Sequence, residues 1–151
     1  MKKYLFIIIL SLFSIFIHAQ SYYTNRGYSY SKVTVQNANG KTDFENTTGG
    51  TVIFGTKNGK NVIGISLGRD MVYQGFVIKT EKGTEVGQYT ISHKFYANLK
   101  GVSTPIVLSE IYDSQYSKTP YMFFLVILDK NAEKPVRYNI FTGIVKSNLY
   151  K

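Results

Sequence analysis

The chain has 151 residues, with 18 basic and 9 acidic residues, two histidines and no cysteine. This length suits one ordinary domain with a core of its own. The absence of cysteine excludes disulfides and an acyl-anchored lipoprotein signal, and so few histidines leave almost no material for a zinc site. We therefore expect neither a metal nor a cofactor.

The basic residues give a formal net charge of +9 and are scattered rather than clustered. Scattered lysines favour solubility and protected sheet edges. Attraction to an acidic cell-surface glycan or to lipopolysaccharide is the alternative interpretation. We expect no nucleic-acid partner, because no binding motif is recognisable.

The first 19 residues have the pattern of a secretory signal peptide. Two lysines are followed by an apolar and hydroxyl stretch over residues 4–17, and small Ala19 stands at a plausible cleavage site. A membrane-spanning helix needs roughly 20 apolar residues, so a retained anchor is the less favoured alternative. We predict cleavage after Ala19, a single domain over residues 20–151, and a location in the periplasm or outside the cell.

The remaining sequence is typical of β-strands separated by tight turns. Short β-branched and aromatic runs alternate with turn residues, and no long window has the apolar spacing of a helix. We expect strands near residues 28–37, 42–46, 51–57, 60–67, 71–80, 86–99, 103–112 and 120–128, with a ninth near 135–145. This spacing predicts an all-β antiparallel meander of about eight or nine strands in a small closed or nearly closed barrel, with a two-sheet sandwich as the alternative.

Short turns predict how neighbouring strands are paired. Two-residue hairpin turns are expected at Asn58-Gly59, Lys82-Gly83 and Lys100-Gly101. If these turns form, the cross-strand pairs include Phe54 with Ile63, Val72 with His93, and His93 with Leu108.

The predicted pairing places several polar residues on one apolar face. His93 is the only histidine after the first 19 residues, and Gln74 and Glu110 become its diagonal neighbours on the two flanking strands. Tyr89 and Tyr112 lie close by on the same side. These five residues are the candidate ligand-binding site. They either line a cavity in the barrel or satisfy one another inside a filled core.

Three other motifs have a simpler interpretation. Residues 64–68 match G-x-S-x-G, but the serine lies inside an alternating strand rather than at a nucleophile elbow. Residues 129–133 lack the glycine and glutamate that complete a calcium loop, so we expect a polar turn. Tyr22 and Tyr23 belong to a tyrosine-rich stretch with Arg26 and Lys32. The aromatic rings of this stretch could stack on sugars or bases. Alternatively, the stretch forms a strand that covers the end of the barrel, or it is a tail.

The leader ending in Ala19-Gln20, together with the cysteine-free, Asn-, Lys-, Tyr- and Ile-rich β composition, resembles small exported proteins of Bacteroidota. The meander also resembles the lipocalin or calycin barrel, although the chain has no tryptophan and so lacks the Gly-x-Trp pattern of lipocalins. The second resemblance implies a barrel that holds a small ligand.

The sequence favours an exported, non-catalytic binding protein. It would hold a small apolar or amphipathic ligand inside the barrel, or bind a partner or glycan at the cell surface. An eight-stranded outer-membrane barrel is the first alternative, since residues 121–128 are apolar on both faces. A small hydrolase that uses His93 as its base is the second alternative. No catalytic residue is assigned.

Overall fold

The computed structural model describes residues 26–36, 41–68, 71–85, 87–99, 101–128 and 138–148. The predicted signal peptide over residues 1–19, Tyr22 and Tyr23, and the polar turn at 129–133 lie outside these residues. Within the described parts there is no helix long and apolar enough to cross a membrane.

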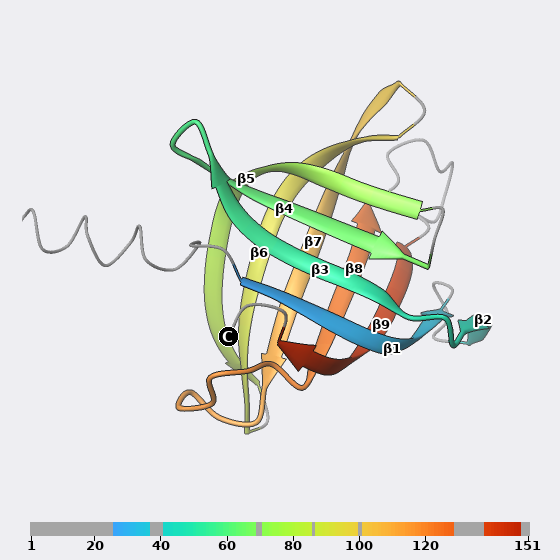
Figure 1. Cartoon of the computed structure of the whole chain (residues 1–151), viewed down its shortest axis with the longest axis vertical. Helices are drawn as coiled ribbons and strands as arrows, with labels where there is room; N and C mark the ends of the chain where they lie inside the picture. The colour runs from blue at the N-terminus through green and yellow to red at the C-terminus, as the bar shows by residue number, and fades with distance from the viewer. Residues whose placement is uncertain are drawn as a thin grey trace, which may run out of the picture.

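The described residues form nine antiparallel strands that follow one another along the chain (Figure 1). They are β1 (Arg26–Gln36), β2 (Thr42–Asn46), β3 (Gly50–Lys57), β4 (Lys60–Leu67), β5 (Met71–Glu85), β6 (Gln88–Leu99), β7 (Val102–Tyr112), β8 (Met122–Leu128) and β9 (Tyr138–Asn148). The predicted strands match these elements closely, except that β5 is five residues longer than expected.

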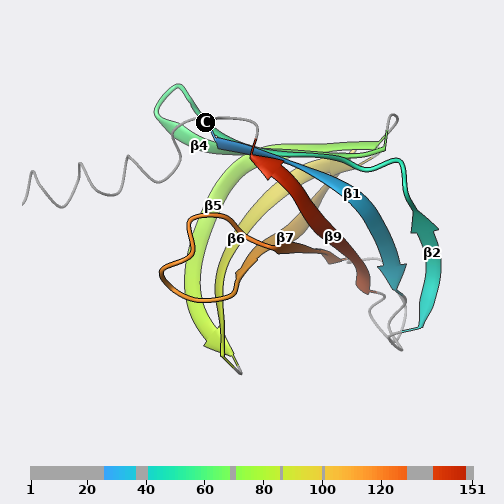
Figure 2. The same cartoon turned by 60° about the horizontal axis from the view of Figure 1, so that its bottom comes forward.

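Pairing between β1 and β9 closes eight of the strands into a barrel. The first half of β1 pairs with β3, and its second half pairs with β2, which stands beside the barrel wall (Figure 2). The predicted closed barrel is therefore confirmed, and the two-sheet sandwich was wrong because a single sheet closes on itself through β1 and β9.

Two of the three predicted hairpins have the expected register. Asn58 and Gly59 have φ angles of 52° and 72°, as a type I′ turn requires, and Phe54 pairs with Ile63. Leu99 pairs with Val102 across the turn at residues 100–101, which brings His93 opposite Leu108. A two-residue turn leaves little choice of register, so the β6–β7 pairing followed from the sequence.

The third hairpin was predicted wrongly. Strand β5 continues through Lys82-Gly83 to Glu85, which pairs with Gln88 across a turn that contains Gly87 with a φ of 77°. His93 therefore lies opposite Thr80 rather than Val72. The apolar face predicted for the middle of β5 points outwards instead of into the barrel.

Strand β5 bends sharply as it passes from β4 to β6 (Figure 2). A bulge lies between Val77 and Lys79, and just before it the backbones of β5 and β6 come unusually close. A Cβ atom at Gly75 would lie 2.2 Å from the carbonyl oxygen of Tyr96. Glycine is thus needed at this position for a close backbone approach rather than for a special φ angle.

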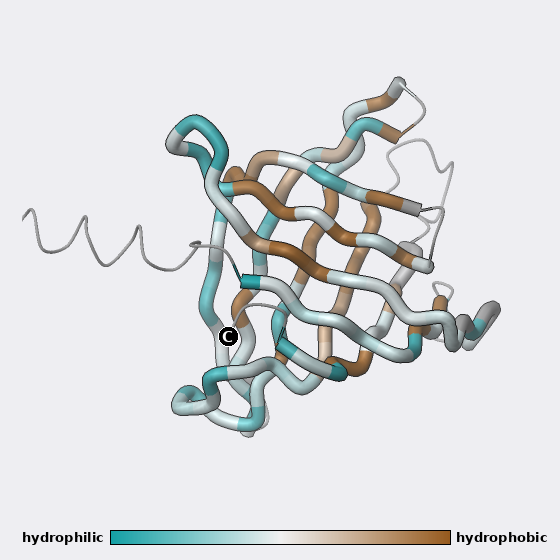
Figure 3. Tube along the Cα trace, in the orientation of Figure 1, coloured by the Kyte–Doolittle hydropathy of each residue, from teal (hydrophilic) through white to brown (hydrophobic). Residues whose placement is uncertain are grey.

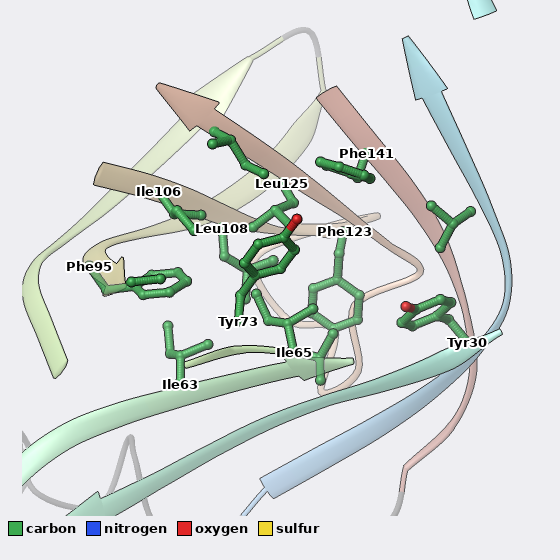
Figure 4. Packing of buried hydrophobic residues seen from close by; sticks show 14 of the residues in the cluster. Tyr30, Ile63, Ile65, Tyr73, Phe95, Ile106, Leu108, Phe123, Leu125 and Phe141 are labelled. Carbon is green, nitrogen blue, oxygen red and sulfur yellow. The ribbon is translucent and has the colours of Figure 1, made fainter. Parts of the chain in front are cut away.

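The barrel is filled by the inward-facing side chains of its strands. Large residues from opposite walls point into the interior, among them Ile63 and Ile65 of β4 and Phe123 and Leu125 of β8 (Figure 4). Along each strand the inward residues, which build this core, alternate with outward residues, as in a small barrel whose interior is filled by side chains. Hydrophobic burial is the main source of stability in such a domain, which has no disulfide.

The outer face carries hydroxyl groups paired across neighbouring strands. The pairs are Ser29 with Ser147, Thr34 with Thr142, Thr51 with Ser66, and Ser92 with Ser109. The hairpin between β3 and β4 is also hydrophilic, while hydrophobic stretches run along the barrel strands (Figure 3). These hydroxyl pairs share the outer face with exposed apolar residues on β3, β5, β6, β7 and β9.

Candidate functional site

His93 and Glu110 form the centre of a buried polar cluster. Both side chains are 0% exposed, and His93 Nε2 lies 2.8 Å from Glu110 Oε2. Because an ionised carboxylate only accepts hydrogen bonds, Nε2 carries the proton in this contact. The other ring nitrogen, Nδ1, lies 3.2 Å from the Thr80 hydroxyl on β5. The predicted closeness of His93 and Glu110 is confirmed.

Arg26 at the start of β1 completes the cluster from across the barrel. Its two terminal nitrogens each lie 2.9 Å from a different oxygen of Glu110, which is a bidentate ion pair. The guanidinium also lies 4.2 Å from the centre of the Phe54 ring, and the His93 ring lies 5.2 Å from that same ring. The pair therefore joins β1 to β7 through the interior, and β8 and β9 lie between them in the wall.

The two candidate tyrosines lie at the edge of this cluster. Tyr112 donates a hydrogen bond of 3.0 Å to Glu110, and its ring lies 6.1 Å from that of Tyr89. Tyr89 pairs with Tyr112 across β6 and β7, as the register predicted. Of the five candidate residues, four are thus brought together.

Gln74 is the candidate that the structure places elsewhere. It pairs with Gly64 on β4 and is exposed on the outside of the barrel. The prediction that it neighbours His93 depended on the Lys82-Gly83 turn, which does not form. The later turn moves Gln74 along the strand away from His93, and the bulge between Val77 and Lys79 turns it to the outer face. Arg26 takes the place that Gln74 was expected to fill.

The environment of the cluster shifts two ionisable groups in opposite directions. Burial alone would raise the pKa of Glu110, but the hydrogen bond from His93 and the charge and hydrogen bonds of Arg26 outweigh burial and hold this pKa below its usual value of 4.5. Burial raises the pKa of Tyr112, and the neighbouring Glu110 charge raises it further. The folded protein thus favours an ionised Glu110 beside a neutral Tyr112.

The chemistry open to this cluster is limited by its enclosure. A histidine acting as a general base must reach both a nucleophile and a substrate, whereas His93 and Glu110 have no exposed surface. The serine of the G-x-S-x-G match, Ser66, lies mid-strand in β4, and its Oγ accepts a hydrogen bond from the backbone N–H of Thr51. No group of three metal-ligating side chains occurs among the residues that the structure describes.

One small cavity lies among the side chains of the core. A cavity of about 20 Å³ lies between Tyr30, Val52, Ile65, Phe123 and Phe141. A cavity of that size holds roughly one water molecule. Tyr30 closes one side by donating a hydrogen bond to the carbonyl oxygen of Ser66.

A much larger hollow lies on the outside of the wall, over β3, β4, β5 and β6. We call it the outer groove; it has a volume of about 520 Å³, and its lining includes Ile53, Gly64, Gln74, Phe76, Tyr96 and Asn98. Ligand sites typically have volumes of roughly 300–1,000 Å³. Sequence reasoning missed this groove because it depends on β5 presenting Gln74 and Phe76 outwards.

Sequence reasoning also left Arg26 out of the polar cluster, although one signal was present. Arg26, Tyr28 and Tyr30 alternate, so a strand begun two residues earlier places the arginine on the same face as the two tyrosines. A buried carboxylate such as Glu110 needs a cationic partner. The contact itself joins residues 84 positions apart, which no local pattern specifies.

The fold and these two features define an eight-stranded antiparallel barrel with a buried ion-pair network and a groove on its outer wall. Comparison with protein-family models, curated proteins and solved structures gives no significant match for this chain.

Proposed function

We propose that this chain is an exported, non-catalytic binding protein that engages its partner through the outside of the barrel. The contrast between the cavity of about 20 Å³ inside and the groove of about 520 Å³ outside carries this proposal. Binding sites are concave and partly apolar, and the outer groove meets both conditions. An internal small-ligand site, which the lipocalin-like meander suggests, is less well supported by these volumes.

The polar cluster supports a structural role for His93 and Glu110 rather than catalysis. Glu110 is hydrogen-bonded to Arg26, His93 and Tyr112. Hydrogen bonds and a cationic partner offset the cost of burying a carboxylate, so such a group can belong to the core of the fold. This favours the non-catalytic proposal over the hydrolase.

The sidedness of the wall favours a protein that works in water over the outer-membrane alternative. Membrane barrels carry an apolar band outside and polar groups inside. In this barrel the apolar core fills the inner face, while the outer face mixes paired serines and threonines with exposed apolar residues such as Val72 and Ile144.

The proposal is tested by expressing the full chain in a Gram-negative host, fractionating the cells and recording a native mass spectrum. We expect the protein in the soluble exported fraction, shortened by 19 residues, as a folded species without a bound small molecule. Recovery in the membrane fraction would support the outer-membrane alternative and overturn the proposal. A lipid or pigment bound in a fixed ratio would overturn the external site in favour of an internal one.

A further inference from the structure

We infer that the outer groove binds an acidic glycan chain. This inference rests on the proposed function and names its ligand class. Four properties of the groove carry it: a floor interrupted by glycines, two exposed aromatic rings, two exposed amides and a basic margin.

The floor of the groove is hollow because glycines interrupt the outer face. Gly64 on β4 lies between Ile53 on β3 and Gln74 on β5 in the pairing of the strands. A Cβ atom added at Gly64 would meet nothing within 4 Å. Gly55 in the next row pairs with Val62. The backbone is thus accessible to a flat ligand at this point.

Two aromatic rings border this floor. Phe76 on β5 is 49% exposed, and Tyr96 on β6 is 40% exposed. Large aromatic rings normally gain by burial, so two exposed rings in one groove indicate a surface that is covered when a ligand binds. The apolar faces of sugar rings offer flat partners of this kind.

The polar groups of the groove suit hydroxyl-rich ligands. Gln74 and Asn98 both line it and are both exposed. Each amide supplies donors and an acceptor, so each can bond the adjacent hydroxyls of a sugar. A purely apolar ligand would leave these amides without partners, which weakens binding.

The charge around the groove favours an acidic ligand. Lys57 lines the groove, and Lys60 Nζ lies 5.7 Å from the centre of the Phe76 ring. Lys94 is exposed on β6, two residues from Tyr96 on the same face. None of the residues lining the groove is acidic. A basic margin attracts an anionic chain and disfavours another basic copy of this protein.

The test uses the purified mature chain and two soluble polysaccharides, acidic alginate and neutral dextran, with affinity measured by titration calorimetry. The variant Gly64→Val fills the floor of the groove while placing its side chain in open space, and valine is well suited to a strand. Phe76→Ala and Tyr96→Ala each remove one ring. Tyr116→Ala is the matched control, because Tyr116 is 83% exposed and does not line the groove.

We expect alginate to bind, dextran to bind much more weakly, and added salt to weaken the alginate complex. Gly64→Val and each ring variant should weaken alginate binding by about tenfold or more, while Tyr116→Ala stays within about twofold of the parent. Thermal unfolding should show that Gly64→Val remains folded.

Three results would overturn the inference while leaving the proposed function standing. Undiminished alginate binding by the groove variants would place the site elsewhere. Failure of the soluble exported protein to bind alginate would exclude the acidic class. Self-association that Gly64→Val abolishes would show that a second copy occupies the groove.

Discussion

Arg26 and Glu110 meet inside the barrel, where each terminal nitrogen of the guanidinium lies 2.9 Å from its own carboxylate oxygen. The arginine side chain is 18% exposed and the glutamate side chain 0%. The ion pair thus connects β1 to β7 through the interior, although β8 and β9 separate these two strands in the wall. Removing Arg26 leaves a fully buried charge on Glu110 without its cation, whereas removing Glu110 leaves an arginine that is partly exposed to water.

Replacing Arg26 with methionine should destabilise the barrel strongly. Methionine keeps an apolar stem but leaves the Glu110 charge buried without its cation, which costs about 3–5 kcal/mol. The control is Lys32→Met, which breaks the exposed ion pair with Glu45 and should cost no more than about 1 kcal/mol. Urea unfolding measures both. Equal losses of unfolding free energy in the two variants would show that the buried ion pair matters no more to stability than the exposed one.

The stability of the protein should fall in acid partly through Glu110. Its folded-state pKa is below the usual 4.5, so its contribution is complete above that value and is lost as the pH falls through the lowered folded pKa. Glu110→Gln removes this titration. Urea midpoints measured from neutral pH into acid should therefore fall more steeply for the parent than for the variant. Parallel curves would contradict the lowered pKa.

Two phenylalanines, one on β3 and one on β5, should respond very differently to truncation. Phe54 is fully buried between Arg26 and His93, so Phe54→Ala should lose about 3–5 kcal/mol of unfolding free energy. Phe76 is half exposed on the outer wall, and Phe76→Ala should lose about 1 kcal/mol or less. Chemical unfolding checks both, and a large loss for Phe76→Ala would mean that its role is in folding rather than binding.

Two glycines that line the outer groove should also differ. A Cβ atom at Gly64 meets open space, so Gly64→Ala should be neutral or slightly stabilising. A Cβ atom at Gly75 would lie 2.2 Å from the Tyr96 carbonyl oxygen, so Gly75→Ala must push β5 and β6 apart. Melting temperatures of the two variants test this contrast. A melting temperature of Gly75→Ala equal to that of the parent would show that the strands are not in close contact there.

The sequence predicted the parts of the fold that depend on local turns. Asn58-Gly59 specifies a two-residue hairpin, and the pairing of His93 with Leu108 follows from a second one. Between β5 and β6 two glycines compete, and Gly87 rather than Gly83 forms the turn. A bulge further along the same pair shifts the register again, and bulges have no reliable local pattern.

Only the part of the candidate site that comes from one hairpin could be predicted from the sequence. His93, Glu110 and Tyr112 come from one hairpin, whose register the sequence specifies. Arg26 lies beside these residues because pairing of β1 with β9 closes the barrel, and this closure is a property of the whole sheet. The outer groove depends on the exposed face of β5, which the bulge between Val77 and Lys79 turns outwards, and no local pattern in the sequence predicted that bulge.

The claim that binding occurs outside the barrel is tested most directly by nuclear magnetic resonance of the isotope-labelled chain, titrated with an acidic alginate oligosaccharide. Binding in the outer groove predicts that chemical shifts change mainly at Ile53, Gly64, Phe76 and Tyr96. The signals of Glu110 and of the interior residue Leu125 should not move. Changes centred on the interior residues, with the groove signals unmoved, would contradict it.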